Sequence, residues 1–135
     1  MTKENTKETY TVHCDYGTDA WVWMKPSDDA TSHIGRIVAD YNGWYADQAI
    51  SGELIEAFNQ WMLVYERAKL YSYENIVKFD WFTFEKNGLI LAKKLKLELP
   101  DATVHYLKPS EDPDYDTNKR LEVLSNGETT EVSSL

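Results

Sequence analysis

The stretch DWFTFEKNGLILAKKLKLELP, residues 80–100, carries the clearest secondary-structure signal in the sequence. Asp80 is a favourable helix N-cap, and Pro100 cannot continue a helix. Between them, one face at helical spacing collects Trp81, Phe84, Gly88, Leu91, Ala92, Leu95 and Leu99. The stretch therefore predicts a long amphipathic helix. Glycine inside a helix costs about 1 kcal/mol relative to alanine, so Gly88 indicates that a neighbouring backbone or bulky ring approaches closely.

A second helix of the same kind precedes this one. Ser51 is a good N-cap, and Glu53 in the first turn complements the positive end of the helix dipole. A broad apolar stripe follows, made of Leu54, Ile55, Phe58, Trp61, Met62 and Tyr65. This pattern predicts a helix from Ser51 to about Leu70.

The N-terminal part of the chain has the period of two that is typical of strands. Side chains alternate between apolar and polar over residues 10–16, a turn follows at 17–19, and residues 20–25 read as the return strand. A third strand is expected to end near Tyr41. The Asn42-Gly43 pair then predicts a turn that leads towards the first helix.

The C-terminal part returns to strand patterns. Residues 103–107 alternate again, and the polar segment 108–118, with its two prolines, predicts a loop. Residues 120–124 read as a strand. The Asn126-Gly127 pair predicts a hairpin turn, after which residues 128–135 form either a short last strand or a tail.

Strands grouped at both ends around central helices predict an α+β fold. We expect a mainly antiparallel sheet, formed by the N-terminal hairpin and the C-terminal strands, packed against two long amphipathic central helices. The length of 135 residues suits a single domain over 1–135, and the polar first eight residues are expected to fray. The composition, 42% hydrophobic and 27% charged, is that of an ordinary globular domain.

The net charge of −9 bears on the class of partner. It disfavours nonspecific binding to nucleic acid or to an anionic membrane. It suits either solubility alone or a cationic protein partner. One cysteine allows no internal disulfide, residues 1–9 do not resemble a signal peptide, and no apolar run is long enough to span a membrane. A cytoplasmic location is therefore expected.

The sequence contains no recognisable catalytic signature. The histidines His13, His33 and His105 are scattered, and no G-x-S-x-G segment is present to position a nucleophile. Cys14 falls on the apolar side of a predicted strand, where cysteine behaves as a small hydrophobic residue. No glycine-rich phosphate loop is present. We expect neither enzymatic activity nor a cofactor, and a small hydrolase that uses a pair of carboxylates is the least favoured alternative.

A metal site receives little support from residue spacing. Asp112, Asp114 and Asp116 form a D-x-D-x-D run, but an EF-hand loop that begins at the first of them requires glycine and glutamate where Thr117 and Val123 stand. One cysteine and separated histidines do not suggest a zinc site.

The acidic residues are the more informative feature. Basic residues gather on the last helix, whereas acids dominate the region after residue 110. One acidic surface can imitate the phosphate row that a cationic nuclease binds, and a tyrosine among the acids can serve as an anchor. The candidate partner-binding residues are Glu111, Asp112, Asp114, Tyr115 and Asp116, together with Asp28 and Asp29. The alternative is a solvated loop whose charges only prevent aggregation.

Two runs in the second half of the chain, FDWFTFEKNGLILAKKL at 79–95 and VHYLKPSED at 104–112, resemble those of a known group of proteins. They are similar to small acidic immunity proteins of bacterial polymorphic-toxin and contact-dependent growth-inhibition systems. The resemblance implies a cytoplasmic antidote that binds a cognate toxin domain, frequently a nuclease, and covers its active site. It transfers no binding residue. The main alternative is a mimic of DNA charge, an accessory or phage protein that inhibits a DNA-binding protein.

Overall fold

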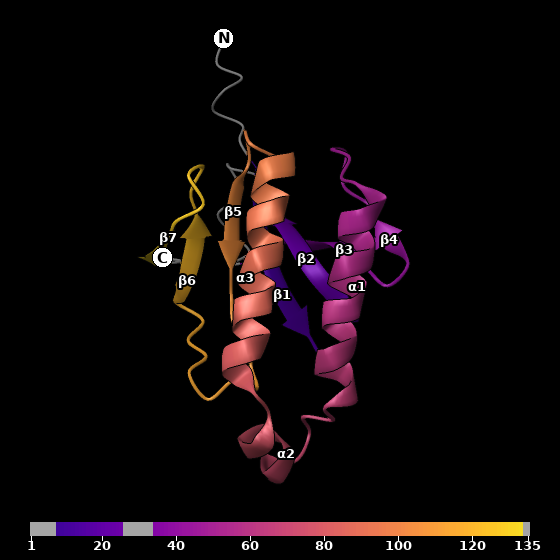
Figure 1. The fold of residues 1–135 in the computed structure, drawn as a ribbon, viewed down its shortest axis with the longest axis vertical. Coiled ribbons are helices and arrows are strands. Elements are labelled where there is room, and N and C mark those ends of the chain that lie inside the picture. The colour runs from indigo at the N-terminus through magenta and orange to yellow at the C-terminus, as the bar shows by residue number, and fades with distance from the viewer. Residues whose placement is uncertain (1–7, 26–33, 134–135) are drawn as a thin grey trace.

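A computed structural model describes residues 8–25 and 34–133. Apart from Glu8, the segment expected to fray lies outside these residues. Seven strands form one sheet in the order β4-β3-β2-β1-β5-β6-β7 (Figure 1). Their bounds are β1 Thr9–Asp15, β2 Ala20–Lys25, β3 Arg36–Asp40, β4 Gly43–Trp44, β5 Thr103–Tyr106, β6 Lys119–Val123 and β7 Thr129–Ser133.

The sheet is antiparallel except at its centre. There β1 runs parallel to β5, with Tyr10 beside Val104 and Val12 beside Tyr106. A parallel pair requires a long crossover connection. Here the whole helical segment lies between the two strands in sequence. The pairing of β1 with β5 therefore joins the N-terminal hairpin to the C-terminal strands.

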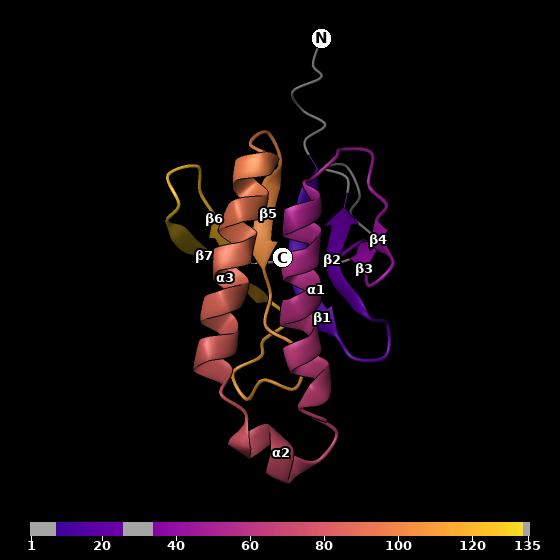
Figure 2. The same cartoon turned by 45° about the vertical axis from the view of Figure 1, so that its right-hand side comes forward.

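Three helices follow β4: α1 Gly52–Arg67, α2 Tyr73–Lys78 and α3 Trp81–Glu98. The long helices α1 and α3 run antiparallel over the same face of the sheet, and α2 joins them at one end (Figures 1 and 2). The α+β class and the mainly antiparallel sheet are thus confirmed. The prediction of two central helices holds only loosely, because the short α2 stands between them.

Both predicted helix caps are present. The side chain of Ser51 accepts a hydrogen bond from the backbone N–H of Leu54 at 3.1 Å. The side chain of Asp80 accepts one from Thr83 N–H, also at 3.1 Å. Ser51 also donates its backbone N–H and its hydroxyl to the two carboxylate oxygens of Glu98, each at 2.7 Å. This contact links the start of α1 to the end of α3.

The close approach predicted at Gly88 is real. A Cβ at this position would lie 2.7 Å from Tyr106 Cε1 and would also overlap the indole of Trp61. That indole stacks on Phe84 with ring centroids 4.6 Å apart, and its Nε1 donates to the Phe84 carbonyl at 2.9 Å. The glycine therefore lets α3 approach both α1 and β5.

The structure differs from the prediction at two points and decides between two outcomes at a third. The turn at Asn42-Gly43 does not lead directly to a helix, because the chain first reverses into β4, with a φ of 132° at Gly43. The short helix α2, capped by Ser72, was not predicted. Of the two outcomes left open for residues 128–135, the structure has the strand, since Thr129–Ser133 forms β7 and pairs with β6.

Candidate functional site

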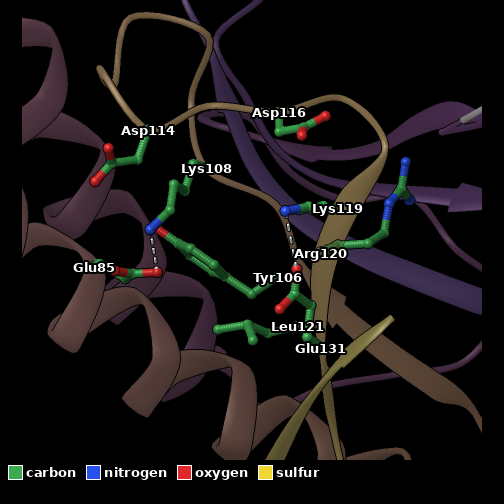
Figure 3. Close-up of a pocket in the computed structure, with 9 residues that line it drawn as sticks. All are labelled: Glu85, Tyr106, Lys108, Asp114, Asp116, Lys119, Arg120, Leu121 and Glu131. Carbon is green, nitrogen blue, oxygen red and sulfur yellow. Dashed lines mark hydrogen bonds and ion pairs between the residues drawn. The ribbon is translucent and has the colours of Figure 1, made fainter. Parts of the chain in front are cut away.

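A pocket of about 210 Å³ lies beside α3, on the side away from α1, where the loop after β5 meets β6 and β7 (Figure 3). We call it the C-terminal pocket. It contains two of the residues predicted to bind a partner, Asp114 and Asp116. The complete lining is Glu85, Tyr106, Lys108, Asp114, Asp116, Lys119, Arg120, Leu121 and Glu131. Four acids, three bases and one tyrosine therefore share this small space.

Most of the basic charge in the pocket is already paired. Lys108 Nζ lies 2.7 Å from Glu85 Oε2, and both side chains are partly buried. Lys119 Nζ lies 3.8 Å from Glu131 Oε2 in an exposed pair. The side chain of Arg120 extends away from the other lining residues (Figure 3).

Unlike Lys108 and Lys119, the two aspartates of the loop that line the pocket are not in ion pairs with other described residues. The carboxylates of Asp114 and Asp116 form no ion pair with another described residue, and both residues are exposed. Asp116 Oδ1 only accepts a hydrogen bond from the backbone N–H of Asn118 at 2.9 Å. The negative charge of these two residues remains available to an approaching cation.

Tyr106 is the uncharged polar group of the pocket. Only 2% of the residue is exposed, and its hydroxyl has no hydrogen-bond partner among the described residues. Burial raises the pKa of this hydroxyl well above its usual value, and the nearby acids raise it further, so it remains a protonated donor. A buried hydroxyl without a partner costs about 1–3 kcal/mol. A polar group that enters the pocket can recover this cost.

Two of the other predicted residues have structural roles. Glu111 accepts a hydrogen bond of 2.6 Å from the hydroxyl of Tyr65, which ties the loop to the end of α1. Tyr115 is half-buried beside the pocket, is not among its lining residues, and donates its backbone N–H to the Asp112 carbonyl at 2.9 Å. Asp28 and Asp29 lie outside the described residues.

Asp112 is far less accessible to a partner than Asp114 and Asp116. The residue is only 7% exposed, and its Oδ1 accepts a hydrogen bond of 2.8 Å from the backbone N–H of Asp114. Burial raises the pKa of its carboxyl group, which opposes ionisation. Sequence spacing could not show this, because three alternating aspartates look equivalent until the loop folds against the rest of the chain.

Several residues of the pocket escaped the sequence interpretation. Glu85 belongs to α3, Tyr106 to β5 and Glu131 to β7, so residues from three separate elements meet only in the folded chain. No local spacing connects them. The one available signal was that Tyr106 lies on the apolar side of its predicted strand.

A second group of polar side chains lies on the sheet face opposite the helices. Thr11 and His105 are register neighbours on β1 and β5, and Arg120 Nη1 donates to the Thr11 hydroxyl at 3.3 Å. Arg120 is only 6% exposed. Burial, and then the charge of Arg120, lowers the pKa of His105 to about 4. Burial also lowers the pKa of His13, whose Nδ1 lies 3.2 Å from the Leu107 carbonyl oxygen.

The other described side chains with reactive chemistry or a shifted pKa lie outside the C-terminal pocket. Cys14 is fully buried, and burial raises the pKa of its thiol. Two carboxyl groups, those of Glu66 and Asp112, have a raised pKa because of burial, but neither lines the C-terminal pocket. Over residues 8–25 and 34–133, no three metal-binding side chains cluster as a potential site. In the same ranges, no helix has the length and apolar character of a membrane span.

Comparison with known proteins found no matching family model, no matching curated protein and no matching solved structure.

Proposed function

We propose that this protein is an immunity protein that binds a cationic toxin domain, of the nuclease class, in the cytoplasm and covers its active site. The supporting observation is the segregation of charge along the fold. Residues 51–99, which hold the three helices, contain seven acidic and seven basic residues. The described residues outside this segment contain thirteen acidic and five basic residues. The surplus of negative charge therefore belongs to the strands and their loops.

A surplus of negative charge on the strands and loops suits an inhibitor of a nucleic-acid-binding enzyme. A nuclease must be positively charged where it binds phosphates, and a complementary field accelerates association with such a surface. Asp114, Asp116 and Glu131 supply exposed carboxylates around the C-terminal pocket. Basic side chains of the toxin would meet these acids, and the role of the protein is binding without catalysis.

The alternative is a mimic of DNA charge that inhibits a DNA-binding protein. The same segregation of charge supports it, but the expected selectivity differs. A charge mimic would compete with DNA for many basic proteins, whereas an antidote would bind one cognate domain. A competition assay with several unrelated DNA-binding proteins separates the two functions.

The test is protection of cells against the toxin domain encoded beside this protein, combined with a binding assay at low and high salt. The test variant carries Asp114→Asn, Asp116→Asn and Glu131→Gln. A matched control carries Asp47→Asn, Glu53→Gln and Glu74→Gln. These substitutions remove the same amount of negative charge from three exposed residues outside the C-terminal pocket. We expect the test variant to lose at least tenfold in association rate, and the control to lose less than threefold.

The results that contradict the proposal are clear. If the parent protein neither binds the toxin domain nor protects the cells, the proposed function is wrong. If it protects, but association has the same rate at 50 mM and 500 mM salt, the protein is an antidote that does not act through its acidic surface.

A further inference from the structure

The outer face of the helical layer carries exposed apolar side chains along both long helices. Val64 on α1 is 54% exposed, and Ile90 and Leu97 on α3 are 42% and 73% exposed. Between the helices lies a groove of about 400 Å³. Its apolar walls include Ala57, Trp61, Val64, Phe84, Ile90 and Leu91. Exposed apolar surface of this kind is typical of an interaction site.

We propose that this face is the interface of a homodimer, in which two copies are related by a two-fold axis parallel to the helices. Each α1 then packs on α3 of the second copy. The two grooves face each other, and the two helical layers stack between the two sheets. This inference is independent of the proposed function, because the C-terminal pocket lies on the other side of α3.

The charges along the two helices are arranged for this pairing. Exposed residues on α1 follow one stripe at steps of three and four, with acids near its start and a base at its end: Glu53, Glu56, Gln60, Val64 and Arg67. On α3, Asp80 caps the start, and the exposed Lys93 and Lys94 lie near the end. Apart from Glu98, whose carboxylate is hydrogen-bonded to Ser51, these exposed charges on the two helices are of opposite sign at each end of the layer.

The structure shows which of these charged residues lie at the same height along the axes of α1 and α3. Glu53 and Ala57 line a shallow hollow together with Lys94, Leu97 and Glu98, so the acidic start of α1 lies level with the last turns of α3. In these turns Lys93 and Lys94 are exposed, whereas the carboxylate of Glu98 accepts hydrogen bonds from Ser51. Arg67, which ends α1, and Asp80 both lie at the end of the layer where α2 is found (Figures 1 and 2).

A two-fold axis parallel to the helices preserves these levels. It places Glu56 opposite the lysines of the second copy and Arg67 opposite Asp80. An axis perpendicular to the helices would instead place α3 on α3, so that the exposed lysines of the two copies, Lys86, Lys93 and Lys94, would share one contact. Like charges that face each other are unfavourable. Charge complementarity therefore selects the parallel axis and a second copy of this chain as the occupant of the groove.

The large net charge does not prevent such a dimer. Residues 51–99, which include the surfaces that meet, have no net charge in total. The negative surplus belongs to the strands and loops. Interactions over distances greater than about 8 Å are strongly screened at physiological ionic strength.

Sedimentation equilibrium of the full chain at physiological ionic strength tests the proposal, over a range of about 1–500 μM. We expect the parent to shift from its monomer mass of 15.7 kDa to twice that mass. Val64→Glu should weaken dimerisation at least tenfold, and its far-ultraviolet circular dichroism should match the parent because Val64 is exposed. Asp114→Lys, on the C-terminal pocket, is the control and should dimerise like the parent.

A charge exchange gives the more specific result. Glu56→Lys alone and Lys94→Glu alone should each weaken the dimer, and the double variant should recover most of the loss. A parent that is monomeric up to 500 μM overturns the proposal and leaves the groove to a helix of another protein. A dimer that is unaffected by Val64→Glu, or not restored by the charge exchange, also overturns it. Since no toxin is present, none of these outcomes depends on the proposed function.

Discussion

The helical segment 51–99 and the C-terminal segment 107–133 contribute to one sheet-based fold, yet they present different surfaces. The helical segment is neutral and exposes apolar side chains such as Val64 and Leu97. The C-terminal segment has seven acids against three bases, and its apolar residues Leu107 and Val123 are buried. The first surface suits contacts that depend on apolar burial, and the second suits contacts that depend on charge.

This difference implies that contacts made by the two surfaces differ in their sensitivity to salt concentration. Screening by salt weakens an interaction between exposed charges but not the burial of apolar area. Self-association through the helices should therefore persist at salt concentrations that weaken binding of a cationic partner. Four further experiments test whether the two regions are as distinct in stability as they are in surface character.

The largest effect is expected where the helical layer meets the sheet. In Gly88→Ala, the new Cβ overlaps the rings of Trp61 and Tyr106, both of which are buried and cannot withdraw easily. We expect a loss of about 3 kcal/mol in the free energy of unfolding, despite the better helix propensity of alanine. Urea denaturation measures it. Gly52→Ala is the control, since nothing lies near its Cβ, and a similar loss in both variants would disprove the packing explanation.

A smaller effect is expected on the sheet face opposite the helices. In the folded protein, burial and then the charge of Arg120 lower the pKa of His105 from its usual 6.5 to about 4. The unfolded chain therefore binds an additional proton between these values, and stability falls as the pH decreases through this window. The loss attributable to His105 is about 2 kcal/mol between pH 7 and pH 5.

The measurement is urea denaturation at both pH values for the parent and for His105→Gln. The variant should lose clearly less stability than the parent on acidification, although the lowered pKa of His13 leaves part of the dependence in place. An identical loss in both proteins would mean that His105 titrates normally in the folded state.

Within the acidic loop, neighbouring aspartates should behave differently. Asp112→Ala removes the acceptor for the backbone N–H of Asp114 and should cost about 1 kcal/mol. Asp114→Ala removes an exposed carboxylate and should change stability by less than about 0.5 kcal/mol. Thermal unfolding of the two variants gives the comparison. Equal effects would show that Asp112 is not a structural residue.

The smallest effect belongs to the exposed pair at the edge of the C-terminal pocket. Lys119 and Glu131 are separated by 3.8 Å, and both side chains are largely exposed. Such pairs contribute about 0–1 kcal/mol. Glu131→Gln should therefore leave the unfolding midpoint in urea nearly unchanged, while a loss above 1 kcal/mol would indicate a structural role.

Periodicity was a reliable guide wherever an element is long and one-sided. Over residues 51–70 and 80–100, the apolar stripes and the caps Ser51 and Asp80 predicted both long helices with nearly their observed bounds. The short elements β4 and α2 were missed because two to six residues cannot establish a period. A short element forms mainly because the rest of the fold supports it.

The candidate site was predictable only in part. The sequence identified an acidic loop, and it includes Asp114 and Asp116, which line the C-terminal pocket. It could not distinguish Asp112 from its neighbours, nor bring Glu85 and Tyr106 to the same pocket. Both facts depend on contacts between residues far apart in the chain.

By itself, the sequence determined the fold class, the long helices and the total charge, because these follow from local periodicity and from composition. Only the tertiary structure decided that β1 pairs with β5, that one aspartate of three is buried, and that the charge surplus lies outside the helical layer. The physical reason is that burial and charge pairing are set by neighbours in space. Those neighbours come together only when β1 pairs with β5 and joins the N-terminal and C-terminal strands into one sheet.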